Sequence, residues 1–203
     1  MNHPPQTDPR LAGTEIVDSV IDTIGETPMI RLKRLSELEG IECVFVMKNE
    51  STNPGGSAKD RPALEMILAA EREGLLQPGG TIVEPTSGNT GVGLAIVAAQ
   101  RGYNCVFVMT DKVAPEKISL LKAYGAEVVV CPVAVEPTDP QSYYSVAERL
   151  THELGAFRPN QYQNPHNPEA HVNTTGPEIW RQTGGRITHF VSSMGTTGTI
   201  TGT

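Results

Sequence analysis

A lysine set among small residues is the first candidate for chemistry in this sequence. Lys59 lies in Asn-Pro-Gly-Gly-Ser-Ala-Lys-Asp-Arg (residues 53–61). The small residues before it leave room for a ring to approach, and the apolar helix expected after it would bury the amine. Burial lowers the pKa of a lysine and frees its amine as a nucleophile, which forms a Schiff base with an aldehyde. The alternative is a solvated surface lysine.

Two loops rich in Gly, Ser and Thr offer backbone N–H groups to anions. Thr-Ser-Gly-Asn-Thr-Gly (86–91) follows the apolar run 81–84, and Gly-Thr-Thr-Gly-Thr (195–199) follows the run 187–193. Small residues let the backbone curl around a phosphate or carboxylate. The alternative for each loop is an ordinary turn. Together with a reactive lysine, the loops match a cofactor with one aldehyde and one phosphate, pyridoxal 5′-phosphate.

Rival cofactors have weaker support. Gly88, Gly91 and Gly93 are spaced G-x-x-G-x-G, whereas a dinucleotide fingerprint is G-x-G-x-x-G. No Gly-Lys-Ser/Thr is present, so the loop 195–199 is not a nucleotide P-loop. The histidines do not have the spacing of a metal pair, and no metal is expected.

Composition narrows the class of protein. The 203 residues carry a net charge of −7, with 38% hydrophobic and 19% charged residues, which is typical of a folded domain. Basic residues are not clustered, so nucleic acid is not an expected partner. No apolar run reaches membrane length and no signal peptide is recognised. Cys43, Cys105 and Cys131 lie in apolar runs and are predicted to be reduced, buried thiols of a cytoplasmic protein.

Apolar runs alternate with helical patterns along the chain. We expect strands at 42–47, 81–84, 104–109, 127–131 and 187–193, and helices at 62–73, 90–101, 115–124, 141–154 and 177–182. The Pro- and Asn-rich stretch 159–168 is expected to be irregular. Strands that alternate with helices predict an α/β protein with parallel sheets covered on both faces. Ligands bind such folds at the carboxyl ends of the strands, where both small-residue loops fall.

These stretches together resemble the pyridoxal-phosphate-dependent cysteine synthase and cystathionine β-synthase family (fold type II). The resemblance runs from about residue 24 to the last residue and is carried by the blocks 25–28, 53–61, 84–91, 161–165, 174–180 and 195–199. It implies two parallel-sheet α/β domains, similar to tryptophan synthase β. We expect a loose leader (1–14), the start of a larger cofactor domain (15–54), a smaller mobile domain (55–158) and a return to the larger domain (159–203). Because the chain stops where a helix should begin, we expect a C-terminally truncated, inactive fragment.

The resemblance also assigns roles to residues. Lys59 would form the Schiff base and move the α-proton. Asn89 would hydrogen-bond the cofactor ring oxygen. The phosphate would be bound by Gly195, Thr196, Thr197, Gly198 and Thr199, and the substrate carboxylate by Thr86, Ser87, Thr90 and Gln161. Ala58 and Thr197 depart from the residues usual in the family, but neither change removes a functional group.

The reaction that the resemblance implies is β-replacement on L-serine or O-acetylserine, which forms a C–S bond through an aminoacrylate. Residues 111–117 and 140–144 favour the cystathionine β-synthase type, in which serine and homocysteine give cystathionine. Residues 192–197 look more like cysteine synthase B, which would combine O-acetylserine with sulfide. A serine/threonine dehydratase and a non-catalytic fragment stay open as alternatives. The resemblance further implies a homodimer of the full-length enzyme.

Overall fold

The computed structural model describes residues 16–40, 42–86 and 88–203, so the expected leader and Ser87 lie outside the described residues. In chain order the elements are η2 (Val20–Thr23), β1 (Met29–Arg31), α1 (Lys33–Glu39), β2 (Val46–Lys48), η3 (Glu50–Thr52), α2 (Asp60–Arg72), β3 (Thr81–Pro85), α3 (Asn89–Arg101), β4 (Asn104–Thr110), α4 (Pro115–Ala123), β5 (Glu127–Cys131), α5 (Tyr143–Glu153), α6 (His166–Ala170), the π-helical turn η4 (His171–Thr175), α7 (Gly176–Gln182) and α8 (Gly198–Gly202).

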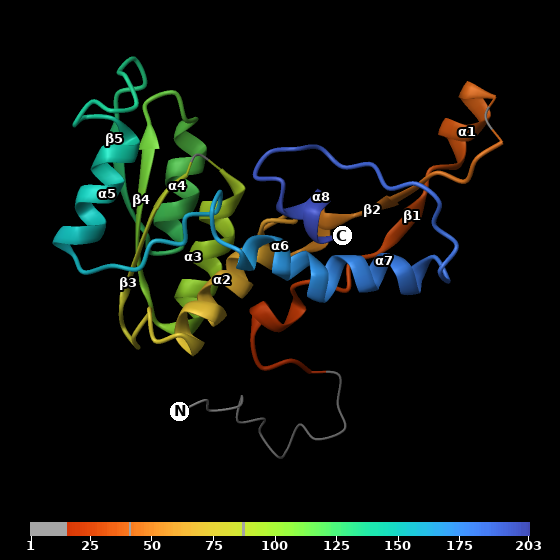
Figure 1. Cartoon of the computed structure of the whole chain (residues 1–203), viewed down its shortest axis with the longest axis horizontal. Coiled ribbons are helices and arrows are strands. Elements are labelled where there is room, and N and C mark those ends of the chain that lie inside the picture. The colour runs from red at the N-terminus through yellow and green to blue at the C-terminus, as the bar shows by residue number, and fades with distance from the viewer. Residues whose placement is uncertain (1–15, 41, 87) are drawn as a thin grey trace.

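A parallel sheet of three strands organises one half of the molecule. Its order is β3-β4-β5, and Val83 pairs with Val106 while Val108 pairs with Val129. Helices α3 and α4 connect the strands and cover one face, and α5 covers the other (Figure 1). The predicted α/β class with a parallel sheet is therefore confirmed.

The two faces of this sheet bury separate apolar clusters. Phe107 and Met109 of β4 belong to the cluster that includes residues of α2, α3 and α4. The intervening Val106 and Val108 belong to the cluster with α5. Successive side chains of a strand point to opposite faces, so a central parallel strand is apolar throughout. This is why 104–109 was recognised from its run of apolar residues.

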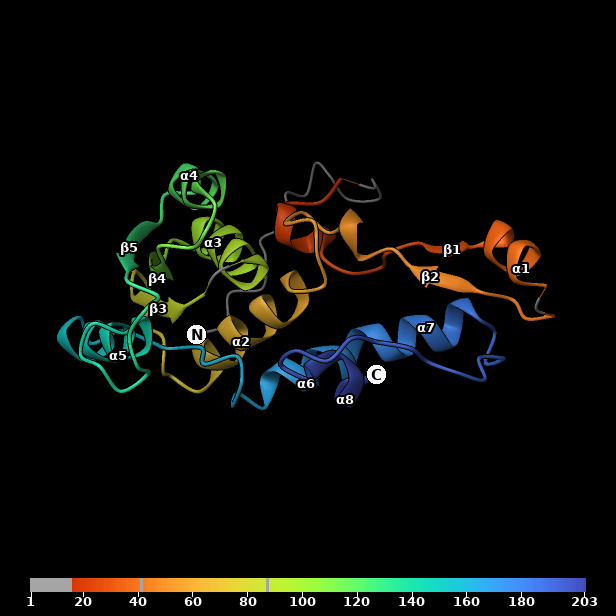
Figure 2. The same ribbon diagram turned by 90° about the horizontal axis from the view of Figure 1, so that it is seen from above.

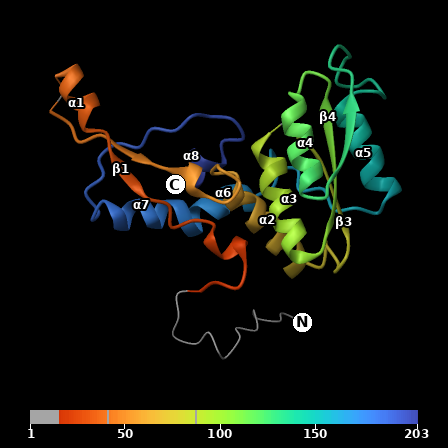
Figure 3. The ribbon, with the colours of Figure 1, turned by 180° about the vertical axis from the view of Figure 1, so that it is seen from behind.

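The other half contains a short antiparallel ladder and a helical run. Strands β1 and β2 pair antiparallel, with Met29 opposite Lys48. Helix α6, the turn η4 and helix α7 follow one another without a break and run below β1 and β2 in Figure 2. Seen from behind, the ladder and α1 extend away from the parallel sheet (Figure 3). In the described part of the chain, no helix has both the length and the apolar character needed to cross a bilayer.

Several sequence predictions were wrong in this half. The expected strand 42–47 is paired only at Val46–Lys48, and 187–193 forms no strand because no described segment pairs with it. The stretch expected to be irregular, 159–168, contains the start of α6. Asn164 Oδ1 accepts the N–H of His166, the first residue of this helix, at 2.9 Å. Pro168 lies in its first turn, where a missing N–H costs little.

Predictions for the other helices were accurate. The bounds of α2, α3, α4, α5 and α7 differ by at most two residues from those expected. The three cysteines are free, but Cys43 is exposed whereas Cys105 and Cys131 are buried. The prediction of a buried thiol was thus wrong for Cys43, which precedes the short strand β2 instead of lying within a strand.

Candidate active site

Lys59 immediately precedes α2, and its backbone is held by two close approaches. The N–H of Gly55 donates to Asp60 Oδ2 at 2.5 Å and folds the glycine turn onto the start of the helix. A Cβ at Gly55 would lie 2.3 Å from Asp60 Oδ1, so only glycine fits there. From α3, a Cβ at Gly93 would lie 3.1 Å from the Lys59 carbonyl oxygen. The two glycines therefore let the turn and a neighbouring helix enclose the lysine.

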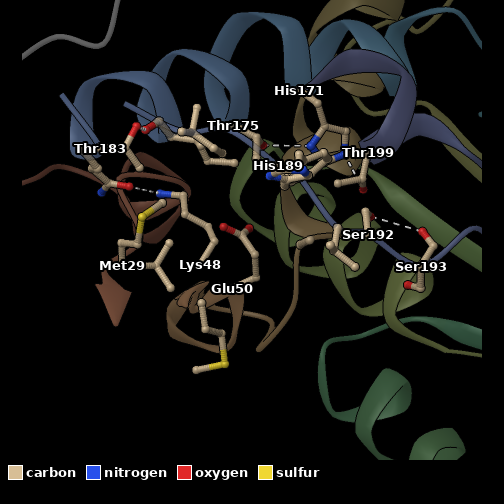
Figure 4. Close-up of a pocket in the computed structure, with 18 of the residues that line it drawn as sticks. Met29, Lys48, Glu50, His171, Thr175, Thr183, His189, Ser192, Ser193 and Thr199 are labelled. Atoms are coloured by element: carbon tan, nitrogen blue, oxygen red, sulfur yellow. Dashed lines mark hydrogen bonds between the residues drawn. The ribbon is translucent and has the colours of Figure 1, made fainter. Parts of the chain in front are cut away.

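Lys59 lines a cavity of about 1280 Å³. The lysine is half-buried, and burial lowers the pKa of its amine. Residues 43–48, 187–193 and 195–199 also line the cavity. In Figure 4, Lys48 and Glu50 lie on one side of it, and His171 and Thr199 lie on the other. The lysine and the loop 195–199, far apart in sequence, thus share one cavity.

The loop 195–199 rests on a buried asparagine. Asn167 of α6 is 2% exposed and donates through Nδ2 to the carbonyl oxygen of Gln161 at 2.8 Å and to Thr196 Oγ1 at 2.9 Å. A Cβ at Gly198 would lie 2.2 Å from Asn167 Oδ1. The absence of a side chain at Gly198 therefore lets the loop close onto Asn167.

A fully buried histidine supports the same loop. His171 lies in the π-helical turn η4, with Nδ1 2.8 Å from Thr175 Oγ1 and Nε2 3.2 Å from Thr199 Oγ1 (Figure 4). Burial lowers its pKa to about 4, and the positive charges of Lys59 and Arg61 act in the same direction. His171 is therefore neutral at physiological pH. Single π-helical turns occur frequently at functional sites.

Thr86, Asn89 and Thr90 lie at or just before the start of α3 and form a second group of polar side chains. Thr90 Oγ1 donates to Gln161 Oε1 at 2.6 Å. The backbone at Gln161 is fixed by Glu84 of β3, whose carboxylate accepts N–H groups from Asn160 at 2.9 Å and Gln161 at 3.2 Å. Asn89 is exposed. This group follows the carboxyl end of β3, where the sequence placed it.

The structure thus separates the predicted site residues into two connected groups. Among the described residues, those lining the cavity include Lys59 and the whole loop 195–199, but not the group formed by Thr86, Asn89, Thr90 and Gln161. Asn167 connects the groups because it binds both the Gln161 carbonyl and Thr196. Sequence reasoning missed Asn167 and His171, which lie in or just after the stretch expected to be irregular.

The residues present fit pyridoxal 5′-phosphate. Within residues 16–40, 42–86 and 88–203, the N–H groups of Gly195, Thr196 and Thr197 donate to no protein acceptor. They belong to a loop that lines the cavity together with an amine whose pKa is lowered. N–H donors suit a phosphate, and the amine suits an aldehyde carbon. Fold and cavity together are those of an α/β protein whose residues could hold this cofactor.

Comparison with known proteins agrees with this class. The sequence pattern of the family described as "Pyridoxal-phosphate dependent enzyme" matches residues 20–203. The chain belongs to this family, whose cofactor is pyridoxal phosphate. The crystal structure of O-ureido-L-serine synthase superposes with a TM-score of 0.84 and 46% sequence identity, over 92% of this chain and 58% of that one.

Two curated relatives are equally similar. Cystathionine beta-synthase of Apis mellifera is 47% identical over 93% of this chain and 38% of its own length. Cysteine synthase B of Escherichia coli (strain K12) is 47% identical over 89% of this chain and 58% of its own length. The chain therefore spans between about one third and three fifths of the length of the relatives it matches.

Proposed function

We propose that the full-length enzyme catalyses β-replacement on L-serine or O-acetylserine and forms a C–S bond with pyridoxal 5′-phosphate as cofactor. We favour the cystathionine β-synthase type, in which serine reacts with homocysteine. The observation that carries the proposal is the cavity shared by Lys59 and the loop 195–199. The names of the two curated relatives support the same kind of chemistry.

In this proposal Lys59 is the catalytic residue. When bound, the cofactor withdraws electrons from the substrate α-carbon. Lys59 would hold the cofactor at the cofactor's aldehyde carbon. Once the substrate amine has displaced it there, its free Nζ would take the proton from the substrate α-carbon and later return it. Burial lowers the pKa of the amine, which brings it closer to the range in which one group can accept and donate a proton. Gly55 and Gly93 keep the lysine backbone in place for this task.

The loop 195–199 is proposed to hold the phosphate. The N–H groups of Gly195, Thr196 and Thr197 and the threonine hydroxyls are its donors. Asn167 and His171 position the loop through their contacts with Thr196 and Thr199. Because His171 is neutral, binding of the phosphate relies on these hydrogen bonds and not on a charged imidazole.

The loop 86–91 is proposed to bind the substrate. Thr86, Ser87, Thr90 and Gln161 hold the substrate carboxylate, and Asn89 binds the ring oxygen of the cofactor. The hydrogen bond between Thr90 and Gln161 supports this assignment, because it brings side chains from two segments to one place.

Cysteine synthase activity is the second candidate. It is favoured by the equal identity to cysteine synthase B and to cystathionine beta-synthase, 47% in each case. The two candidates differ in the acceptor, which is sulfide in one and homocysteine in the other.

We extend the proposal to a cytoplasmic homodimer of the full-length enzyme, to be tested by sedimentation and by localising a tagged protein.

The proposal is tested by trapping the cofactor on the protein. The purified protein is incubated with pyridoxal 5′-phosphate, reduced with borohydride and digested for mass spectrometry. We expect a pyridoxyl adduct on Lys59 and none at this position in Lys59→Ala. Lys33, whose side chain is 71% exposed, is the internal control for non-specific labelling. Equal labelling of the two lysines would contradict the assignment. Assays of the full-length enzyme with homocysteine and with sulfide then identify the acceptor.

A further inference from the structure

A buried arginine lies two residues after Lys59. The side chain of Arg61 is 1% exposed and pairs with two carboxylates. Its Nη1 and Nη2 donate to Glu178 of α7 at 2.6 and 2.8 Å. Its Nε and Nη2 donate to Glu50 at 2.7 and 2.8 Å. Both pairs are bidentate, a geometry that fixes orientation as well as distance.

Each carboxylate is held in turn by other groups. Glu178 accepts from Lys48 Nζ at 2.5 Å and from the N–H of Glu26 at 3.0 Å. Glu50 accepts from Thr27 Oγ1 at 2.7 Å and from Asn53 Nδ2 at 2.9 Å. The network therefore joins the first turn of α2 to α7, to β2 and to the segment before β1.

The network reaches the lysine from its other side as well. Asn53, which is 3% exposed, also donates through Nδ2 to the carbonyl oxygen of Ser57 at 3.1 Å. Ser57 Oγ in turn accepts the N–H of Lys59 at 3.2 Å. Lys59 thus lies between Ser57, which is linked to Glu50 through Asn53, and Arg61, which pairs with Glu50 directly.

Charge energetics favour a positioning role over simple stabilisation of the fold. Although burial opposes it, hydrogen bonds from Arg61 and Lys48 lower the pKa of Glu178 to about 2, so the ion pair persists across physiological pH. Buried ion pairs are often no more stabilising than apolar residues of similar volume, because desolvation offsets the attraction. What a bidentate arginine adds is a fixed geometry next to Lys59.

The helical run that holds Arg61 also holds the loop 195–199. Glu178 lies in α7, and Asn167, which binds Thr196, lies in α6 of the same uninterrupted run. Helix α8 packs closely on this run, since a Cβ at Gly202 would lie 2.1 Å from the carbonyl oxygen of Pro168. The run therefore connects the lysine to the proposed phosphate loop.

We propose that Arg61, paired with Glu178 and Glu50, is a positioning residue that holds Lys59 at a fixed distance from the loop 195–199. We call these three paired side chains the clamp. This inference rests on the proposed function. The clamp keeps the amine within reach of the aldehyde carbon while the loop holds the phosphate. Loss of the clamp leaves the phosphate loop in place and lowers the capture of the aldehyde.

The test compares two ligands that differ at one carbon. Pyridoxal 5′-phosphate has an aldehyde, and pyridoxine 5′-phosphate has a hydroxymethyl group in its place, so only the first can be captured by Lys59. The measure of how well the lysine is positioned is the dissociation constant of pyridoxine 5′-phosphate divided by that of pyridoxal 5′-phosphate. This ligand ratio is high when Lys59 captures the aldehyde. It is determined by equilibrium dialysis for the wild type and for Arg61→Met, Arg61→Lys and Glu178→Gln. Misplacement of a reacting group by about 1 Å can cost about 100-fold in its reactivity toward its partner. We therefore expect the ligand ratio to fall at least about 10-fold in these variants.

Arg101→Met is the matched control. Arg101 makes a bidentate pair with Glu71, near the far end of α2, at 2.5 Å for both contacts. Its loss removes an arginine–glutamate pair that joins the last residue of α3 to α2, and we expect the ligand ratio to stay at the wild-type value. If Arg61→Met does not fold, Arg61→Lys and Glu178→Gln decide the question, since the first preserves the positive charge of the buried group and the second preserves its size.

Three outcomes would overturn the inference. A wild-type ratio in Arg61→Lys and Glu178→Gln would show that the clamp does not position the lysine. An equal weakening of both ligands would show general damage to the fold. A wild type that does not distinguish the two ligands and forms no adduct at Lys59 would overturn the proposed function itself, and this outcome is recognised without any variant.

Discussion

Replacing Gly198 by alanine tests whether the loop 195–199 depends on its contact with Asn167. The new Cβ would lie 2.2 Å from Asn167 Oδ1, 2.6 Å from its Cγ and 2.9 Å from its Nδ2. Asn167 is 2% exposed, and its Nδ2 is held by Gln161 and Thr196. The asparagine can therefore move away only by breaking these hydrogen bonds, or the loop must lift from α6.

The expected cost follows from these contacts. Overpacking of a buried site costs about 1–3 kcal/mol. Each hydrogen bond lost adds about 0.5–1.5 kcal/mol, so the free energy of unfolding should fall by more than about 2 kcal/mol. Because domains of this kind have only about 5–15 kcal/mol of stability, the change should be readily seen as a lower urea midpoint.

Gly195→Ala is the control for this prediction. A Cβ at Gly195 meets nothing within 4 Å, although the residue belongs to the same loop. We expect its urea midpoint to match that of the wild type, while Gly198→Ala is destabilised and binds pyridoxal 5′-phosphate more weakly. If both variants unfold at the wild-type midpoint, or both are destabilised equally, the argument from close packing onto Asn167 is refuted.

Three further predictions concern titration and reactivity. Burial lowers the pKa of Lys59, so an amine-directed reagent should label it at lower pH than exposed lysines; a common pH midpoint for all lysines would contradict this. Burial opposes protonation of His166, but hydrogen bonds to Glu169 and Glu73 raise its pKa. Its contribution to stability is therefore complete below the unfolded-state pKa of about 6.5 and is lost as the pH rises through the folded-state pKa. The stability difference between wild type and His166→Gln should shrink as the pH rises above about 6.5, and a constant difference would refute the assignment. Cys43 is exposed, so iodoacetamide should modify it in the folded protein and reach the two buried cysteines only after unfolding; labelling of all three at equal rates would contradict the structure.

The parallel sheet was predictable because its signals are local. Residues 104–109 and 127–131 are apolar runs of strand length, and Gly102 and Gly125 end the preceding helices. Both glycines have a positive φ, the conformation that ends a helix without strain. The ladder β1–β2 was harder to predict, since three-residue strands show no alternation. The prediction of a strand at 187–193 was wrong because apolar β-branched residues indicate strand propensity but do not supply a neighbouring strand to pair with.

The site was only partly predictable from sequence. Lys59 and the loop 195–199 were chosen from sequence because a lysine among small residues and a Gly/Thr-rich loop together match a cofactor with one aldehyde and one phosphate, whereas each motif alone is equally compatible with an ordinary surface residue or turn. Asn167 and Arg61 carry no such signal, since asparagine in a Pro/Asn-rich stretch indicates a turn and arginine in a helix indicates a solvated surface. Their importance comes from partners distant in sequence: Thr196 for Asn167, and Glu178 for Arg61.

One feature of the helical run α6–η4–α7 offers a signal for such residues. Asn167, His171 and Glu178 are separated by four and seven residues, the spacing of neighbours on one face of a helix. They are 2%, 0% and 5% exposed, and they contact Thr196, Thr199 and Arg61 respectively. Buried polar groups must be hydrogen-bonded. A helix with polar residues along its buried face must therefore pack against polar partners, which is what a binding site provides and an apolar core does not. Hydrophobic periodicity cannot detect such a helix, because its buried face is polar. The prolines and asparagines of 159–168 then led to the prediction that the start of the run is irregular.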